Sequence, residues 1–495
     1  MYNKGFDNDK YIELQSKKIL ERISSFGGKL YLEFGGKLFD DYHAARVLPG
    51  FCPDSKIKML INMKENAEMI IVVSATSIEQ NKVRSDLGIT YDMDTLRLID
   101  AFTEAGIYVG GVVITQYSNQ PAADAFIKRL ENLGVKVYKH YPIEGYPTNV
   151  RKIVSDNGYG KNEYIETKKP LVVITAPGPG SGKMATCLSQ LYHDHKRGIK
   201  AGYAKFETFP IWNLPLQHPV NMAYEAATVD LNDVNMIDPY HLEATGITAV
   251  NYNRDIEIFP VLQAMFKQIY GECTYKSPTD MGVNMAGYCI VDDEAVCNAS
   301  KMEIVRRYYD TLCRKLNGTA DADEVYKSEL IMSKVGIDTS YRRVVKAALD
   351  KAEATGGPAA AIELGDGTIV TGKTSKLMGA SAAALLNALK KLGGIDDSLL
   401  LLPAVLMEPL QKLKVENLGN SNPRLHSDEV LIALAISATT NPVAAMAMEQ
   451  LPKLRGCQAH VSVMLSNIDI TIYKKLGIDL TSESIHATKK LYHKQ

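Results

Sequence analysis

The sequence predicts an α/β protein whose N-terminal half contains a mostly parallel sheet. Runs of valine and isoleucine of strand length alternate with amphipathic stretches of helical spacing, as in a parallel sheet covered by helices on both faces. A glycine-rich turn separates one of these runs from the helical stretch that follows it. The chain has 495 residues, more than one hydrophobic core usually supports, and we therefore expect several domains.

The predicted elements of the first half follow one another in regular order. We expect strands at residues 30–34, 69–74, 108–115, 135–138 and 171–175, and helices at 10–25, 57–66, 94–105, 122–133 and 184–195. Residues 205–219 contain three prolines, which exclude a helix or a central strand and predict a long ordered loop. We assign residues 1–260 to one three-layer α/β domain.

The second half changes character twice. Helical stretches without strand runs predict a helical subdomain at residues 261–353, and residues 354–495 predict a C-terminal α/β domain. In that domain we expect a hairpin of strands at 359–364 and 368–371, later strands at 399–402 and 460–465, and helices at 380–391, 426–439 and 442–451.

Composition excludes several classes of function. The formal net charge of −1 provides no basic field for nucleic acid, and no apolar run is long enough to span a membrane. The first 18 residues are polar and lack the apolar core of a secretory signal. The seven cysteines include no CxxC pair, so we expect a reduced cytoplasmic protein without a zinc knuckle.

The strongest chemical suggestion is the turn at residues 177–183, between a predicted strand and a predicted helix. Backbone N–H groups of a glycine-rich turn and the positive end of a helix together bind phosphate. We expect a phosphate or nucleotide to contact Gly178, Gly180, Ser181, Gly182 and Lys183. The turn departs from the usual phosphate-loop pattern, because Pro177 replaces its first glycine and Met184 replaces the hydroxyl that ligates Mg²⁺. A plain strand-to-helix turn is the alternative.

Further candidates follow the glycine loop along the chain. Lys205 and Arg254 could add positive charge for a phosphate, and His218 or His241 could act as acid or base. Any Mg²⁺ would need carboxylates, for which the candidates are Asp230, Asp233 and Asp238. Asp233 and Asp238 could instead be helix caps or turn residues.

The C-terminal hairpin followed by an alanine-rich helix is similar in layout to the cytidine-deaminase fold. Those enzymes carry a His/Cys-x-Glu at the start of that helix and a Pro-Cys-x-x-Cys later. Here the helix start reads Gly379-Ala-Ser-Ala-Ala, and the later segment reads Ser466-Asn-Ile-Asp469. The zinc ligands are missing, and we expect no zinc.

The whole chain resembles the uncharacterised bacterial protein family 0371, with the domain of unknown function 1846. The resemblance is carried by segments at residues 32–46, 87–92, 175–190, 202–215 and 230–238. It implies a bacterial protein of several α/β parts and implies no particular reaction.

Two hypotheses of function remain open. The first is an enzyme, a transferase or ligase acting by phosphoryl transfer on a nucleotide or another small phosphorylated molecule, where positioning and charge neutralisation supply most of the catalysis. The second is a non-catalytic protein that senses such a molecule or serves a structural role. Under either hypothesis we expect a homo-oligomer.

Overall fold

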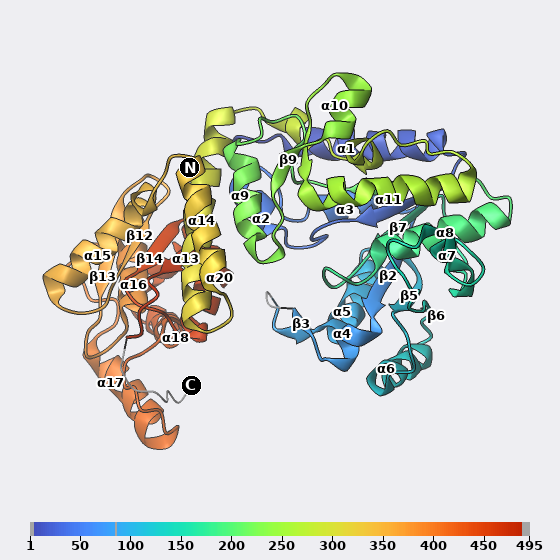
Figure 1. Ribbon diagram of the computed structural model, residues 1–495. Helices are drawn as coiled ribbons and strands as arrows, with labels where there is room; N and C mark the ends of the chain where they lie inside the picture. Colours follow the sequence, from blue (N-terminus) through green and yellow to red (C-terminus); the bar gives the residue numbers. More distant parts are fainter. Residues whose placement is uncertain (1–3, 85–86, 488–495) are drawn as a thin grey trace. The chain divides into compact units, whose positions relative to one another are not determined.

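The computed structural model describes residues 4–84 and 87–487 and is a mixed α/β structure (Figure 1). Contacts group the chain into two compact units. The first, here called the sheet unit, comprises Lys4–Tyr224 and Asp233–Val296. The second, the C-terminal unit, comprises Glu225–Asn232 and the chain from Cys297 onward. The three-part division at residues 260 and 353 stays a prediction.

A seven-stranded sheet forms the core of the sheet unit, with the order β11-β8-β1-β7-β2-β5-β6. All neighbouring strands pair in parallel. The strands are β1 (Leu30–Phe34), β2 (Ala67–Ser74), β5 (Tyr108–Thr115), β6 (Val137–Lys139), β7 (Leu171–Thr175), β8 (Gly202–Phe206) and β11 (Gly282–Val283). The prediction of a parallel sheet is confirmed. The two-residue strand β11 lies in the region for which only helices were expected.

Helices cover both faces of this sheet because successive strand residues point to opposite sides. On one face, Leu32, Val173 and Ile71 pack against helices α1 (Asn8–Ser25), α3 (Ser55–Asn62), α5 (Tyr91–Glu104) and α6 (Pro121–Asn132). On the other face, Tyr31 and Val172 pack against α8 (Lys183–Lys196) and α11 (Asn253–Tyr270).

Smaller elements complete the sheet unit. They are the helices α2 (Tyr42–Val47), α4 (Ala75–Glu79), α7 (Val150–Ile153), α10 (Pro239–Thr245) and α12 (Pro278–Met281), and two antiparallel strand pairs, β3 (Val83–Arg84) with β4 (Ile89–Thr90) and β9 (Asn235–Ile237) with β10 (Val250–Tyr252). Helix α9 (Pro219–Ala227) follows the proline-rich loop.

Strands β1 and β7 mark the point where the direction of winding reverses. The chain leaves β1 for β2 through α3 on one face of the sheet, and it leaves β7 for β8 through α8 on the opposite face. Neighbouring strands whose connections go to opposite faces leave a crevice at their carboxyl ends, where open α/β sheets bind ligands. The glycine-rich turn follows β7 at this point.

The C-terminal unit is built on a smaller sheet of order β13-β12-β14-β15. Strand β12 is antiparallel to β13 and β14, and β14 is parallel to β15. The strands are β12 (Ala359–Glu363), β13 (Ile369–Lys373), β14 (Gln458–Val461) and β15 (Asp479–Ser482). Ala361 packs under α15 (Arg343–Thr355) on one face, and Ala360 and Ile362 pack against a larger helical layer on the other.

The helices from residue 293 onward are α13 (Asp293–Leu316), α14 (Ala322–Lys334), α15 (Arg343–Thr355), α16 (Ala380–Leu392), α17 (Ala404–Lys412), α18 (Ser427–Ala438), α19 (Pro442–Met448) and α20 (Asn467–Lys475). The predicted hairpin and alanine-rich helix are confirmed. The prediction of a strand at residues 399–402 is wrong. Leu401 and Leu402 are buried in an irregular turn before Pro403, and they pair with no strand among the described residues.

Candidate functional site

The glycine loop between β7 and α8 is tightly fixed on one side and open on the other. Gly180 and Gly182 have φ angles of 75° and 89°, a left-handed conformation that favours glycine, and Gly182 is the N-cap of α8. A Cβ added to Gly178 would lie 2.1 Å from the Tyr91 hydroxyl, whereas one added to Gly180 would meet nothing within 4 Å. The loop therefore has one face packed against the protein and one that leaves room for an approaching group.

Hydroxyl groups near the loop hold its backbone in place. Thr115 Oγ1 donates to the Ser181 carbonyl oxygen at 2.7 Å, and Ser181 Oγ donates to the Gly178 carbonyl oxygen at 2.9 Å. Thr186 is fully buried and donates back to the Gly182 carbonyl oxygen at 3.0 Å. These hydroxyls serve the loop itself, and that of Thr186 does not replace the missing magnesium hydroxyl at Met184.

Lys183 is the first residue of α8, and its ammonium group has no partner among the residues that the structure describes. Burial lowers the pKa of Lys183 below its usual value, Glu33 acts in the opposite direction, and Lys205 and Arg254 add to the lowering. A half-buried cation at a glycine loop, beside two other cations and without an ion pair, favours an anion as its missing partner.

Lys205, in contrast, already has its counter-ions. It stands beside Glu33 in the register of β8 and β1, and its Nζ lies 2.5 Å from Asp255 Oδ2 and 2.7 Å from Glu207 Oε1. Burial alone would lower the pKa of Lys205, but the carboxylates of Asp255, Glu207 and Glu33 raise it above its usual value. We refer to Glu33, Lys183, Lys205, Glu207 and Asp255 as the strand-end site.

Glu207 is the titratable group of the strand-end site. It is 6% exposed, and burial raises its pKa to about 7, with Lys205 opposing the rise and Asp255 adding to it. A carboxyl group whose pKa lies near neutral pH can both donate and accept a proton under physiological conditions, as general acid–base catalysis requires.

The other predicted cation and the predicted histidines are held by local contacts. Arg254 is 54% exposed and pairs with Asp233 at 3.2 Å. His218 uses both ring nitrogens, with Nε2 3.0 Å from Asp293 Oδ1 and Nδ1 accepting from the Val220 amide at 3.3 Å. His241 Nδ1 lies 3.2 Å from Ser277 Oγ. Neither histidine contacts Lys183, and their roles as acid or base stay predictions.

The predicted metal ligands differ in how far their oxygens are occupied. Asp238 is fully buried at the N-terminus of α10, where its two oxygens accept from the amides of Tyr240 and His241 and from the amide and hydroxyl of Thr279. This is the helix-cap role that the sequence left open for it. Asp233 is paired with Arg254, and Asp230 is an exposed residue of the C-terminal unit. Metal binding by Asp230 and Asp233 stays a prediction. Asp238 does not fit as a Mg²⁺ ligand, because both of its oxygens already accept hydrogen bonds.

Sequence reasoning missed the carboxylates Glu33, Glu207 and Asp255. Glu33 carries the one available signal, since a charged residue in the otherwise apolar stretch Leu30–Phe34, just before a glycine pair, is unusual in a buried strand. Glu207 lies in the loop after β8, and Asp255 lies in α11. The two carboxylates that contact Lys205 are therefore far apart in sequence.

The whole chain was compared with protein families and with individual known proteins. Family models described as "Domain of unknown function DUF1846, N-terminal" and "C-terminal" match residues 4–336 and 340–492. A UPF0371 protein of Streptococcus thermophilus (strain ATCC BAA-491 / LMD-9) is 58% identical over 494 residues, with 100% of both chains covered. A UPF0371 protein of Streptococcus pneumoniae (strain JJA) is 56% identical over the same coverage. No helix among the described residues is long and apolar enough to cross a bilayer.

Proposed function

The chain belongs to the family of the domain of unknown function 1846, and we propose that its sheet unit binds a small phosphorylated molecule at residues 177–183. The observation that carries this proposal is Lys183, a half-buried ammonium without a partner among the described residues, placed at a glycine loop and a helix N-terminus. The place in the fold supports it, because the loop follows β7 where the winding of the sheet reverses.

A nucleotide or phosphometabolite suits this arrangement better than a carboxylate ligand. The backbone amides of the loop and Lys183 can hold several phosphate oxygens, whereas a carboxylate offers only two. Glu207, with its pKa near 7, would exchange a proton with the group that attacks or leaves, and the half-buried Lys205 would keep the Glu207 carboxylate in position. The proposed reaction class is therefore phosphoryl transfer or ligation.

A thermal-shift screen of the full chain with nucleotides and phosphometabolites, each with and without Mg²⁺, tests the binding. A ligand at a hundred times its dissociation constant should stabilise the wild type by about 2.7 kcal/mol. Lys183→Ala should abolish that shift. Lys17→Ala, which removes an exposed lysine from α1 of the same unit, should leave it intact. The proposal fails if no phosphorylated compound shifts the wild type, or if Lys183→Ala responds as fully as Lys17→Ala.

A measurement of turnover distinguishes the proposed enzyme from the alternative function, a non-catalytic sensing or structural protein. With a ligand identified, release of phosphate or formation of a product should be measurable, and Glu207→Gln should slow it by about 10²-fold or more while binding persists. Tight binding without turnover in the wild type would favour a sensor. Sedimentation at several protein concentrations would test the proposed homo-oligomer separately.

A further inference from the structure

Helix α17 of the C-terminal unit is attached to that unit along one face. Met407 is buried in the hydrophobic core of the unit, and Leu410 packs partly against the same core. Gln411 Nε2 donates to the carbonyl oxygens of Lys376 and Pro423 at 2.9 and 3.0 Å. Residues three and four positions apart share one face of a helix, so these three side chains define the inner face of α17.

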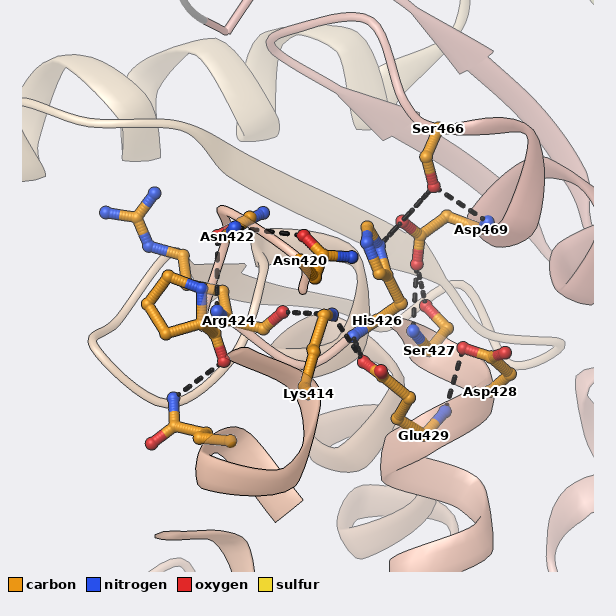
Figure 2. Close-up of polar contacts among 12 residues, drawn as sticks. Lys414, Asn420, Asn422, Arg424, His426, Ser427, Asp428, Glu429, Ser466 and Asp469 are labelled. Atoms are coloured by element: carbon orange, nitrogen blue, oxygen red, sulfur yellow. Dashed lines mark hydrogen bonds and ion pairs between the residues drawn. The ribbon is translucent and has the colours of Figure 1, made fainter. Parts of the chain in front are cut away.

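A buried lysine anchors the end of this helix. α17 passes into a π-helical turn, Leu413–Asn417, and Lys414 of that turn is 4% exposed. Its Nζ donates to Glu429 Oε2 and to the Arg424 carbonyl oxygen, both at 2.7 Å. Figure 2 shows Lys414 reaching Glu429 at the start of α18 and Arg424 in the loop before it. The folded unit therefore sets the direction in which α17 points.

The outer face of α17 is apolar and exposed to solvent. Val405 is 71% exposed, Leu406 39% and Leu413 47%, and Pro409 is also exposed. Val405, Pro409 and Leu413 follow one another at intervals of four residues, and Leu406 lies beside them. We refer to these four residues as the α17 stripe. A helix of a soluble domain turns its apolar stripe to the core, and a second stripe that faces solvent marks an interaction site.

Two residues of opposite charge border the α17 stripe along one side. Glu408 and Lys412 are both exposed and lie four residues apart, so they form a row parallel to the stripe. Lys412 Nζ also lies 3.8 Å from Glu416 Oε2, in a pair whose side chains are both more than half exposed and which therefore holds Lys412 only weakly. The outer face of α17 thus combines an apolar centre with one negative and one positive charge at its edge.

A second copy of the chain complements this surface. When two α17 helices pack antiparallel about a two-fold axis, Val405 lies opposite Leu413 of the partner subunit, and the two charged rows lie along the same edge. Glu408 then faces Lys412 of the partner subunit, and the symmetry creates this contact twice. A parallel pair would place the two rows on opposite edges, where neither charge meets its opposite. The antiparallel arrangement alone matches both the apolar and the charged parts of the surface.

We propose that the chain forms a two-fold symmetric dimer in which the α17 stripes of two copies pack antiparallel against each other. This association lies in the C-terminal unit and does not depend on phosphate binding in the sheet unit. One helix on each side covers less than the roughly 800 Å² per partner of a standard stable interface. The dimer therefore dissociates on dilution and forms at micromolar concentration or above.

Analytical ultracentrifugation of the full chain, from about 1 µM to about 1 mM, tests the association over the range of weak affinities. The wild type should pass from monomer to dimer. Val405→Lys places a charge in the apolar contact and should raise the dissociation constant by about tenfold or more. Leu349→Lys is the matched control, since Leu349 is a 40% exposed residue of α15, which covers the opposite face of the C-terminal sheet. It should associate as the wild type does.

Charge reversal tests the antiparallel arrangement itself. Glu408→Lys or Lys412→Glu places like charges opposite each other twice in each dimer, and either should raise the dissociation constant by about tenfold. The double variant, Glu408→Lys with Lys412→Glu, exchanges the two charges and should associate nearly as tightly as the wild type. This recovery requires that each residue meets the other one across a two-fold axis.

Melting curves show whether each variant remains folded. The proposal is overturned if the wild type sediments as a monomer over the whole range, or if Val405→Lys associates as tightly as Leu349→Lys. It is also overturned if the folded double variant does not recover the association that the single reversals lose. Hydrogen exchange of the α17 amides provides a last check, because protection that is equal at all protein concentrations would mean that another part of the same chain covers the stripe, which also contradicts the dimer.

Discussion

Glu207 in the sheet unit and Asp469 in the C-terminal unit are carboxyl groups of nearly equal burial, but their pKa values are shifted in opposite directions. Glu207 is 6% exposed and Asp469 is 4% exposed. Burial raises the pKa of Glu207 to about 7. Burial also raises the pKa of Asp469, but hydrogen bonds from His426 and Ser427 outweigh it and lower that pKa to about 2.

The number of donors and the sign of nearby charges account for the difference. Asp469 accepts five hydrogen bonds and has no second carboxylate among its partners. Glu207 has one close cation, Lys205, which it shares with Asp255. A buried carboxylate with many donors is fixed in its charged form, and one with few donors near like charge is free to change its protonation.

Removal of Lys205 should have the largest effect on stability. Lys205→Met leaves the buried Glu207 and the half-buried Asp255 without their cation, and we expect it to lower the free energy of unfolding by about 3 kcal/mol at pH 8. Chemical denaturation measures the loss. Lys136→Met is the control, since Lys136 and Glu166 form an exposed pair at 3.2 Å in the same unit, and breaking it should change the free energy of unfolding far less. Equal losses in the two variants would contradict the importance of the buried pair.

The two carboxyl groups should give opposite dependences of stability on pH. The folded pKa of Glu207 is raised, so its contribution is present below about 4.5 and is lost as the pH rises through about 7. The folded pKa of Asp469 is lowered from 3.8, so its contribution, about 2 kcal/mol, is present above 3.8 and is lost as the pH falls through about 2.

Denaturation curves against pH check this difference with one variant for each group. The stability of the wild type relative to Glu207→Gln should fall between pH 5 and pH 8. The stability of the wild type relative to Asp469→Asn should fall between pH 4 and pH 2. A rise with pH in the first comparison would show that Glu207 is fixed in its charged form, as Asp469 is.

The smallest expected effect comes from one donor to Asp469. Ser427→Ala removes the hydroxyl 2.6 Å from Oδ1 and should lower the free energy of unfolding by about 1.5 kcal/mol and raise the pKa of Asp469. Nuclear magnetic resonance titration of the carboxyl carbon measures the pKa. Ser398→Ala removes a comparable hydroxyl from the exposed Asp396 and should leave the free energy of unfolding nearly unchanged. An unchanged pKa in Ser427→Ala would mean that the other donors suffice.

Local patterns in the sequence were enough to predict individual elements. The strands 30–34, 108–115 and 171–175 have the predicted bounds in the structure, because short, mostly apolar runs bounded by turn residues leave little choice of where each strand begins and ends. The four leucines at 399–402 misled the same reasoning. Their apolar character reflects partial burial in a turn, and no partner strand is present beside them in the described chain.

The candidate sites likewise contain a part that local sequence predicts and a part that depends on the fold. The glycine loop and Lys183 are consecutive residues, so one local pattern points to both. The remainder of the strand-end site depends on the placement of β1 between β7 and β8, which brings Glu33 beside Lys205. His426 and Asp469 are 43 residues apart and meet only because α18 and α20 begin at one place. Nothing in either segment alone specifies that meeting.

The composition of the two compact units has a consequence for synthesis on the ribosome. Residues 225–232 belong to the C-terminal unit, where the exposed Lys334 of α14 lies 3.6 Å from Glu225. This short segment leaves the ribosome before α14, the helix that it contacts. These eight residues can therefore take up their contacts only after the chain has been made as far as Lys334.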